Sequence, residues 1–188
     1  TKTSAGTRFG DGVQGDGAGG GARVRDLTFD WTSDWTVAML VQVPSTGGAL
    51  NPLNVDGSFE MFKIQASAGG TSLLQVEFKP GYIRISTRES GAATILDDID
   101  NGSDNPLRAP FWMILSYDAS AQEFRAHTPN GEVLGVASRS VPPALTSGGY
   151  INWSLNGSLS ASKVIIDELA VYDRLLSADE VMAIQELR

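Results

Sequence analysis

The sequence has no cysteine and a single histidine, His127. These absences exclude a disulfide framework, thiolate zinc sites, cysteine nucleophiles and metal sites built from several histidines. No run of 18 apolar residues occurs, so we expect no membrane insertion. The 14 basic residues are scattered and are outnumbered by 22 acidic ones, giving a net charge of −8. This balance argues against nucleic acid or an anionic membrane as the main partner.

The composition otherwise fits a globular protein. The chain has 188 residues, of which 41% are hydrophobic, enough for one domain with its own core. Residues 1–21 contain eight of the 21 glycines and almost no apolar side chains. We therefore predict a Gly-rich N-terminal arm over 1–21, held by the domain or by another subunit, and a single domain over 22–188. No basic-apolar-small leader opens the chain, so we expect a mature fragment or a protein made without a secretory signal.

Short strands are predicted along most of the domain. In four stretches every second side chain shares a face, as in a β-strand: 35–43, 74–78, 83–85 and 124–128. The turn residues Pro80-Gly81 predict a hairpin, and Asn130-Gly131 predicts a second turn. Residues 111–117 are apolar on both faces, as expected of a central strand. The pattern predicts an all-β antiparallel sandwich or barrel.

The stretch 163–188 predicts a strand that runs into a capped helix. Ser177 and Glu180 have the spacing of a capping box, in which each side chain bonds to the backbone amide of the other. Leu176 and Val181 have the spacing of a hydrophobic staple. We therefore expect a short C-terminal helix whose apolar side lies on the domain.

Four stretches, in this order, carry a resemblance to a known family: Phe9-Gly10-Asp11-Gly12; Asp34-Trp35-Thr36-Val37; Phe111-Trp112 through Tyr117-Asp118 followed by Asn130-Gly131; and Ile166-Asp167-Glu168-Leu169 through Leu176-Ser177 to Glu180-Val181. They resemble the laminin-G-like, concanavalin A-like jelly-roll domains. The resemblance implies a two-sheet antiparallel jelly-roll sandwich with a short C-terminal helix. It also implies a Ca²⁺ ion at the rim, held by Asp167 with Asp11 as a second ligand. The alternative is that Asp167 accepts backbone hydrogen bonds at a turn or strand edge.

A glycosidase on this fold needs two carboxylates on one face, flanking the same bond. Strict alternation along 167–172 predicts one face with Asp167, Leu169 and Val171 and another with Glu168, Ala170 and Tyr172. The two acids are then separated, and we interpret the chain as not an enzyme.

Other motifs have structural explanations. Asp97, Asp98, Asp100 and Asp104 form an acidic segment that suggests calcium, but the spacing does not fit an EF-hand, and we predict a solvated loop. The Gly10–Gly15 stretch matches a dinucleotide fingerprint without the flanking strand and helix that it requires. The glycosylation sequons at 101–103, 152–154 and 156–158 are interpreted as turns.

Aromatic residues are the candidates for sugar binding, because an aromatic ring offers an apolar face to a pyranose. Trp31, Tyr82, Tyr150 and Trp153 are considered, against the alternative that they belong to the core. Of these, we predict a carbohydrate-binding role for Tyr82, Tyr150 and Trp153. His127 shares a strand face with Glu123 and Arg125, which predicts a solvated rather than a catalytic histidine.

Three functions remain open from the sequence. The first is a non-enzymatic structural or adhesive subunit of a larger assembly, a phage virion protein of the capsid-decoration, fibre or tail type with glycan binding as an added role. Its arm would contact other protein subunits. The alternative is a carbohydrate-binding module of a secreted or cell-surface protein, located extracellularly instead of in a virion. A glycan-cleaving enzyme is the third.

Overall fold

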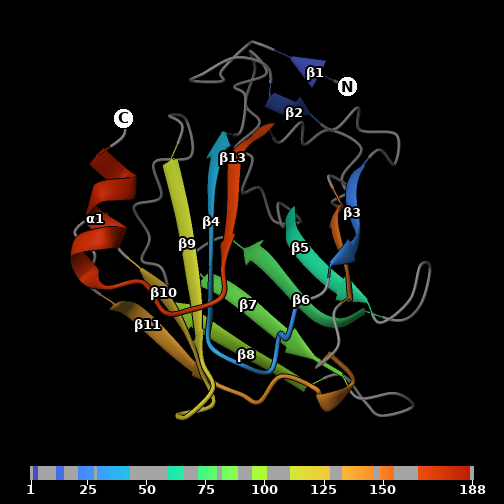
Figure 1. Ribbon diagram of the computed structural model, residues 1–188, viewed down its shortest axis with the longest axis vertical. Helices are drawn as coiled ribbons and strands as arrows, with labels where there is room; N and C mark the ends of the chain where they lie inside the picture. Colours follow the sequence, from blue (N-terminus) through green and yellow to red (C-terminus); the bar gives the residue numbers. More distant parts are fainter. Residues whose placement is uncertain are drawn as a thin grey trace.

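The computed structural model describes residues 2–3, 12–14, 21–27, 29–42, 59–65, 72–79, 82–88, 95–100, 111–127, 133–145, 149–154 and 165–186. These residues form two antiparallel sheets and one short C-terminal helix (Figure 1). Sheet A has the strand order β1 (Lys2–Thr3), β2 (Gly12–Gln14), β13 (Ile165–Tyr172), β4 (Trp35–Gln42), β9 (Phe111–Asp118), β10 (Glu123–His127), β11 (Val133–Ser138). Sheet B has the order β3 (Gly21–Leu27), β12 (Gly149–Ser154), β5 (Phe59–Gln65), β6 (Ser72–Lys79), β7 (Tyr82–Thr87), β8 (Ile95–Asp100). A 3-10 turn, Pro143–Leu145, precedes β12.

The two sheets pack together through an apolar core to which both contribute. Sheet A supplies residues of β4, β9, β10 and β11, and sheet B supplies residues of β5, β6 and β7. Trp35 lies among aromatic rings, 5.4 Å from Trp31 and 5.8 Å from Phe124 between ring centroids. Trp31 is fully buried in this cluster. It is therefore a core residue and not a candidate for sugar binding.

The predicted hairpin and central strand are confirmed. β6 and β7 pair antiparallel with Lys79 opposite Tyr82, which leaves Pro80-Gly81 as a two-residue connection outside the described residues. β9 lies between β4 and β10 in sheet A. Its alternate residues enter two different apolar clusters, because Met113 and Leu115 face sheet B while Trp112 and Ile114 face away from it.

Helix α1 (Ala178–Glu186) covers part of the outer face of sheet A and lies beside β9 (Figure 1). A second cluster of buried residues forms beneath it: Ala38, Leu40, Trp112, Ile114, Leu176 and Val181. Thr36 is fully buried next to this cluster. Its hydroxyl donates to Arg174 O at 3.0 Å and accepts from Leu176 N at 3.2 Å, which ties the connection before α1 to β4.

The predicted capping box and staple are both confirmed. Ser177 N donates to Glu180 Oε2 at 2.9 Å, and Glu180 N donates to Ser177 Oγ at 3.3 Å. Leu176 and Val181 are buried in the same cluster. Arg174 adds two bonds to the Glu180 carboxylate, at 2.8 and 2.6 Å. Within the described residues, no helix has the length and apolar character needed to cross a membrane.

One sequence interpretation changes at this level. The acidic segment is not a loop over its first part, because Asp97, Asp98 and Asp100 lie in β8; Asp104 lies outside the described residues. Parts of the predicted N-terminal arm pair with the domain, since β2 is antiparallel to β13 and β1 is antiparallel to β2. The division into an arm and one domain stays a prediction.

Candidate functional site

The outer face of sheet B carries polar side chains over several neighbouring strands. In β5, β6 and β7 the alternate residues Ile64, Leu74, Val76, Ile83 and Ile85 enter the core. The residues between them therefore lie on the outward side. We call this surface the polar face; its members with described side chains are Lys63, Gln65, Gln75, Glu77, Arg84 and Ser86.

The strand register aligns these residues in rows across the sheet. One row contains Lys63, Gln75 and Ser86, which lie directly opposite one another on β5, β6 and β7. The next contains Glu77 opposite Arg84, which in turn lies opposite Asp98 of β8. Directly opposite residues have Cβ atoms about 5 Å apart, so Lys63, Gln75 and Ser86 form one line of polar groups, and Glu77 and Arg84 form the start of another.

These side chains are held in place. Gln65 and Ser86 are only 7% and 6% exposed, so they hold the face together and are not themselves open to a ligand. Lys63, Gln75, Glu77 and Arg84 are half-buried, and each has at least one interaction partner. Groups whose conformations are already restricted lose less entropy when a ligand binds. Amides, carboxylates and cations together can both donate to and accept from the hydroxyl groups of a polyol.

The predicted sugar-binding aromatics lie on two separate strands of sheet B. Tyr82 begins β7, whereas Tyr150 and Trp153 belong to β12. β5 and β6 lie between these strands, so three strand spacings put Tyr82 at least about 14 Å from the other two backbones. Tyr150 is paired with Gln65 and Tyr82 with Lys79, at positions of the polar face. The structure does not gather the three aromatics, and their binding role stays a prediction.

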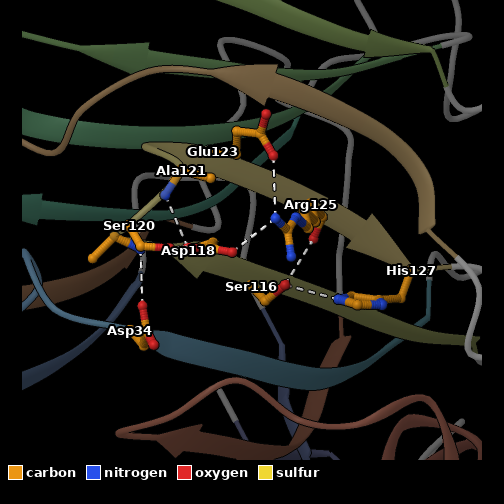
Figure 2. A network of polar contacts seen from close by, with 9 residues as sticks. Asp34, Ser116, Asp118, Ser120, Ala121, Glu123, Arg125 and His127 are labelled. Carbon is orange, nitrogen blue, oxygen red and sulfur yellow. Dashed lines mark hydrogen bonds and ion pairs between the residues drawn. The ribbon is translucent and has the colours of Figure 1, made fainter.

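A second polar arrangement lies on the outer face of sheet A, at the turn between β9 and β10 (Figure 2). Asp118 accepts bonds from Ser120 Oγ at 2.7 Å and from Ala121 N at 3.0 Å, and it pairs with Arg125 at 2.7 Å. Arg125 also contacts Glu123 at 3.2 Å. The hydrogen bonds from Ser120 and Ala121, together with the Arg125 charge, hold the pKa of Asp118 below its usual range. We call this set the Asp118 clamp; because its carboxylate oxygens bond within the chain, it stabilises the turn.

His127 lies at the end of the same face, as predicted. It is half-buried, and its Nε2 is 2.8 Å from Ser116 Oγ. A serine next to a histidine is the beginning of a nucleophilic site, but Ser116 is only 2% exposed. A hydroxyl enclosed by the sheet is not open to a substrate, and we interpret the pair as a structural contact between β9 and β10.

The calcium prediction concerns Asp167 and Asp11. Asp167 lies in β13 opposite Leu40, and β13 pairs with β2 through Ile166 and Val13. Asp11 comes one residue before β2 and lies outside the described residues. In the described residues, no group of three or more His, Asp or Glu side chains could hold a metal ion. The Asp167 and Asp11 site stays a prediction.

The alternation predicted for β13 is confirmed from Leu169 to Tyr172, because Leu169 and Val171 pack on the core between the sheets and Tyr172 packs on the cluster beneath α1, but it is wrong at Asp167 and Glu168. Asp167 is opposite Leu40 and Ala170 is opposite Ala38, so three steps along β13 match two along β4. The extra residue is a β-bulge, and Glu168 has a φ of 49°, in the left-handed region. Asp167 and Ala170 therefore lie opposite residues of one face of β4. The argument against a glycosidase from strict alternation loses its basis.

The fold is similar to that of solved toxin domains. The binding domain of Paraclostridial Mosquitocidal Protein 1 matches with a TM-score of 0.67 and 12% identity, over 97% of this chain and 45% of that chain. The binding domain of botulinum neurotoxin serotype G matches with a TM-score of 0.62 and 14% identity, over 87% of this chain and 39% of that chain. This chain shares its fold with part of these binding domains.

A third structure is of botulinum neurotoxin type C, whose cell entry depends on interaction with two ganglioside molecules. It matches with a TM-score of 0.56 and 7% identity, over 82% of this chain and 36% of that chain. No protein-family model matches the sequence, and no curated protein matches it. The chain spans less than half the length of the three solved chains, so the likeness concerns the β-sheet fold alone.

Sequence reasoning missed the polar face. Its residues were recognised only as the polar members of separate strands, such as Gln75 and Glu77 on one and Arg84 on the next. Alternation could have placed each of them on an outward side. The order of the strands in sheet B, which brings β12 beside β5, has no local signal in the sequence.

Proposed function

We propose that the chain is a non-enzymatic binding module that recognises a glycan on the polar face. The rows of restricted donors and acceptors that cross β5, β6 and β7 carry this proposal. Sugar hydroxyls both donate and accept, and a surface that offers both kinds of group in fixed positions suits them. The likeness to toxin binding domains is consistent with a binding role.

We further propose that the two sheets form a concanavalin A-like jelly roll, as the sequence resemblance implies. Sheet-on-sheet packing around an apolar core fits that architecture. Of the two locations considered, we propose the extracellular or cell-surface one. The phage virion role and the contact with other protein subunits remain predictions that the fold likeness does not support.

The direct test is binding of the whole chain to a glycan array, followed by titration calorimetry with the best oligosaccharide. We expect Gln75→Ala and Lys63→Ala each to weaken binding by about tenfold, because each removes one hydrogen-bonding group worth about 1.4 kcal/mol. The matched control is Ser138→Ala, at an exposed position of β11 in sheet A, which should leave binding unchanged. If no oligosaccharide binds the whole chain, the proposal is wrong.

The aromatic prediction is tested in the same assay. Tyr82→Ala and Tyr150→Ala should each weaken binding if their rings stack on sugar units. Because β5 and β6 separate the two strands, an effect of both would indicate an extended oligosaccharide. An effect of neither would remove the stacking role and leave the polar rows as the site.

A further inference from the structure

The described strands leave four edges, β1 and β11 in sheet A and β3 and β8 in sheet B (Figure 1). Three of these edge strands contain charged residues: a lysine in β1, two arginines and an aspartate in β3, and three aspartates in β8. The fourth, β11, has the sequence VLGVAS and contains none. Charged residues on an edge strand oppose its pairing with another chain. β11 is therefore the edge at which nothing of this kind opposes pairing.

The side chains of β11 add apolar surface at this edge. Among the described residues, the exposed large hydrophobic side chains are Val133 and Val136, at 47% and 43%. Ala137 is buried in the core between the sheets, so Val136 and Ser138 on either side of it lie on the outer face of sheet A. β8 lies against β11 from the facing sheet without pairing with it. The outer side of β11 is thus open and partly apolar.

The backbone of β11 also has hydrogen-bonding groups directed away from the sheet. Arg139 N donates to Gln122 O at 2.8 Å, one position beyond the end of the β10–β11 ladder. Directly opposite pairs in an antiparallel ladder alternate between bonded and non-bonded pairs. Counting back from this bonded pair, Ala137 bonds to β10, whereas Val136 and Ser138 direct their N–H and C=O groups to the open edge. An extended strand is the partner that matches such a row of groups.

A second copy of β11 matches this edge in charge. Pairing with β1, β3 or β8 of another copy would place charged residues opposite the uncharged strand, whereas pairing with another β11 places none there. In the sequence, Glu132 precedes β11 and Arg139 follows it. An antiparallel pair sets the start of one strand beside the end of the other. The acidic end of one β11 therefore comes beside the basic end of its partner.

We propose that two copies of this chain pair antiparallel through β11 and join their A sheets across a two-fold axis. A bulge between Val133 and Gly135 leaves 135–138 as the regular part of the strand. Pairing centred on Val136 uses this part and sets the two Val136 side chains opposite one another. Because identical patches meet, association closes at a dimer. The polar face belongs to sheet B, so the dimer does not depend on the proposed glycan binding.

The first test is sedimentation equilibrium of the whole chain between about 1 and 100 µM, a range suited to a weak dimer. We expect a monomer–dimer equilibrium. Val136→Lys should be monomeric throughout, because it places a charge on the edge of both copies. The matched control is Ala183→Lys, which adds the same charge at an exposed position of α1 and should dimerise as the wild type does. A wild type that stays monomeric, or a Val136→Lys variant that dimerises equally well, would overturn the proposal.

The direction of the backbone groups is tested with proline, which has no N–H. Ser138→Pro removes an amide directed at the open edge, so it should abolish the dimer and leave the melting temperature of the monomer nearly unchanged. Ala137→Pro is the matched comparison, because it removes an amide that bonds to β10, and it should lower the melting temperature strongly. A dimer that persists in Ser138→Pro contradicts the pairing. An equal loss of melting temperature in both variants contradicts the assigned open edge.

The absence of cysteine from the chain allows a clean cross-linking experiment. Val136→Cys should give a covalent dimer with a short bis-maleimide reagent, because the two side chains lie opposite one another across the pair. Ala183→Cys on the exposed side of α1 is the matched control and should remain monomeric on a denaturing gel. Equal cross-linking of the two variants would show that chance encounters and not β11 pairing bring the copies together, and the proposal would be wrong.

Discussion

The two outer faces of the molecule differ in how their side chains are used. On sheet A, Trp112 and Ile114 are covered by α1, and the remaining polar groups of the Asp118 clamp bond to one another. On sheet B, polar side chains line up in rows across the strands. The same alternation of inward and outward residues therefore produces one face that contributes to stability and one polar face, which we propose for binding. Substitutions on sheet A should change stability most, and those on sheet B should change binding most.

The largest expected loss of stability is for Ile114→Ala. Ile114 is 1% exposed in the cluster beneath α1, and its truncation should cost about 3 kcal/mol through lost burial and a residual cavity. Gln75→Ala on the polar face is the matched comparison and should cost less than about 0.5 kcal/mol. Chemical denaturation of both variants measures the difference. Similar losses at the two positions would mean that the two faces do not divide stability and binding in this way.

The next largest effect is expected for Thr36→Val, which keeps the shape of the side chain and removes its hydroxyl. The Leu176 amide would lose its 3.2 Å acceptor, and Arg174 O would lose its donor, at a buried position. A buried amide without a partner costs about 2 kcal/mol. Thr36→Ser keeps the hydroxyl and should lose less stability than Thr36→Val. The reverse order in denaturation experiments would show that the methyl group matters more than the two hydrogen bonds.

The sequence predicted these elements well where the signal is local. The capping box at Ser177 and Glu180, the hairpin of β6 and β7 and the apolar central strand over 111–117 each depend on neighbouring residues, and the structure confirms them. Strand β8 was missed because consecutive aspartates are unusual in strands. The bulge at Glu168 was missed because no glycine marks its left-handed backbone.

The candidate site was less predictable, because it depends on strands that are distant in sequence. The neighbours of Arg84 come from β6 and β8, and those of Lys63 come from β12 and β6. Aromatic residues gave the clearest sugar-binding signal in the sequence, but the type of one residue does not tell whether its side chain is exposed or which side chains lie beside it. Trp31 has it and is a core residue. Only the register shows which polar residues share a row.

The smallest expected effect on sheet A concerns the start of α1. Ser177→Ala removes the acceptor for the Glu180 amide and should cost about 1 kcal/mol, less than the core substitutions because this end is exposed. The two bonds from Arg174, followed by the bond from Ser177 N, lower the pKa of Glu180 from 4.5 to about 2. A carboxyl whose pKa is depressed on folding stabilises the protein above its unfolded pKa. That contribution is lost as the pH falls through the folded pKa.

The stability from Glu180 is therefore expected to be complete above pH 4.5 and to be lost progressively as the pH falls toward about 2. Glu180→Gln should be less stable than the wild type at neutral pH, and the difference between the two should shrink over that interval. Urea denaturation at several pH values measures both. Glu77→Gln on the polar face is the matched control for loss of a carboxylate. If the difference for Glu180→Gln were constant from pH 6 to pH 2, the cap would act through its shape and not through the charge of its carboxylate.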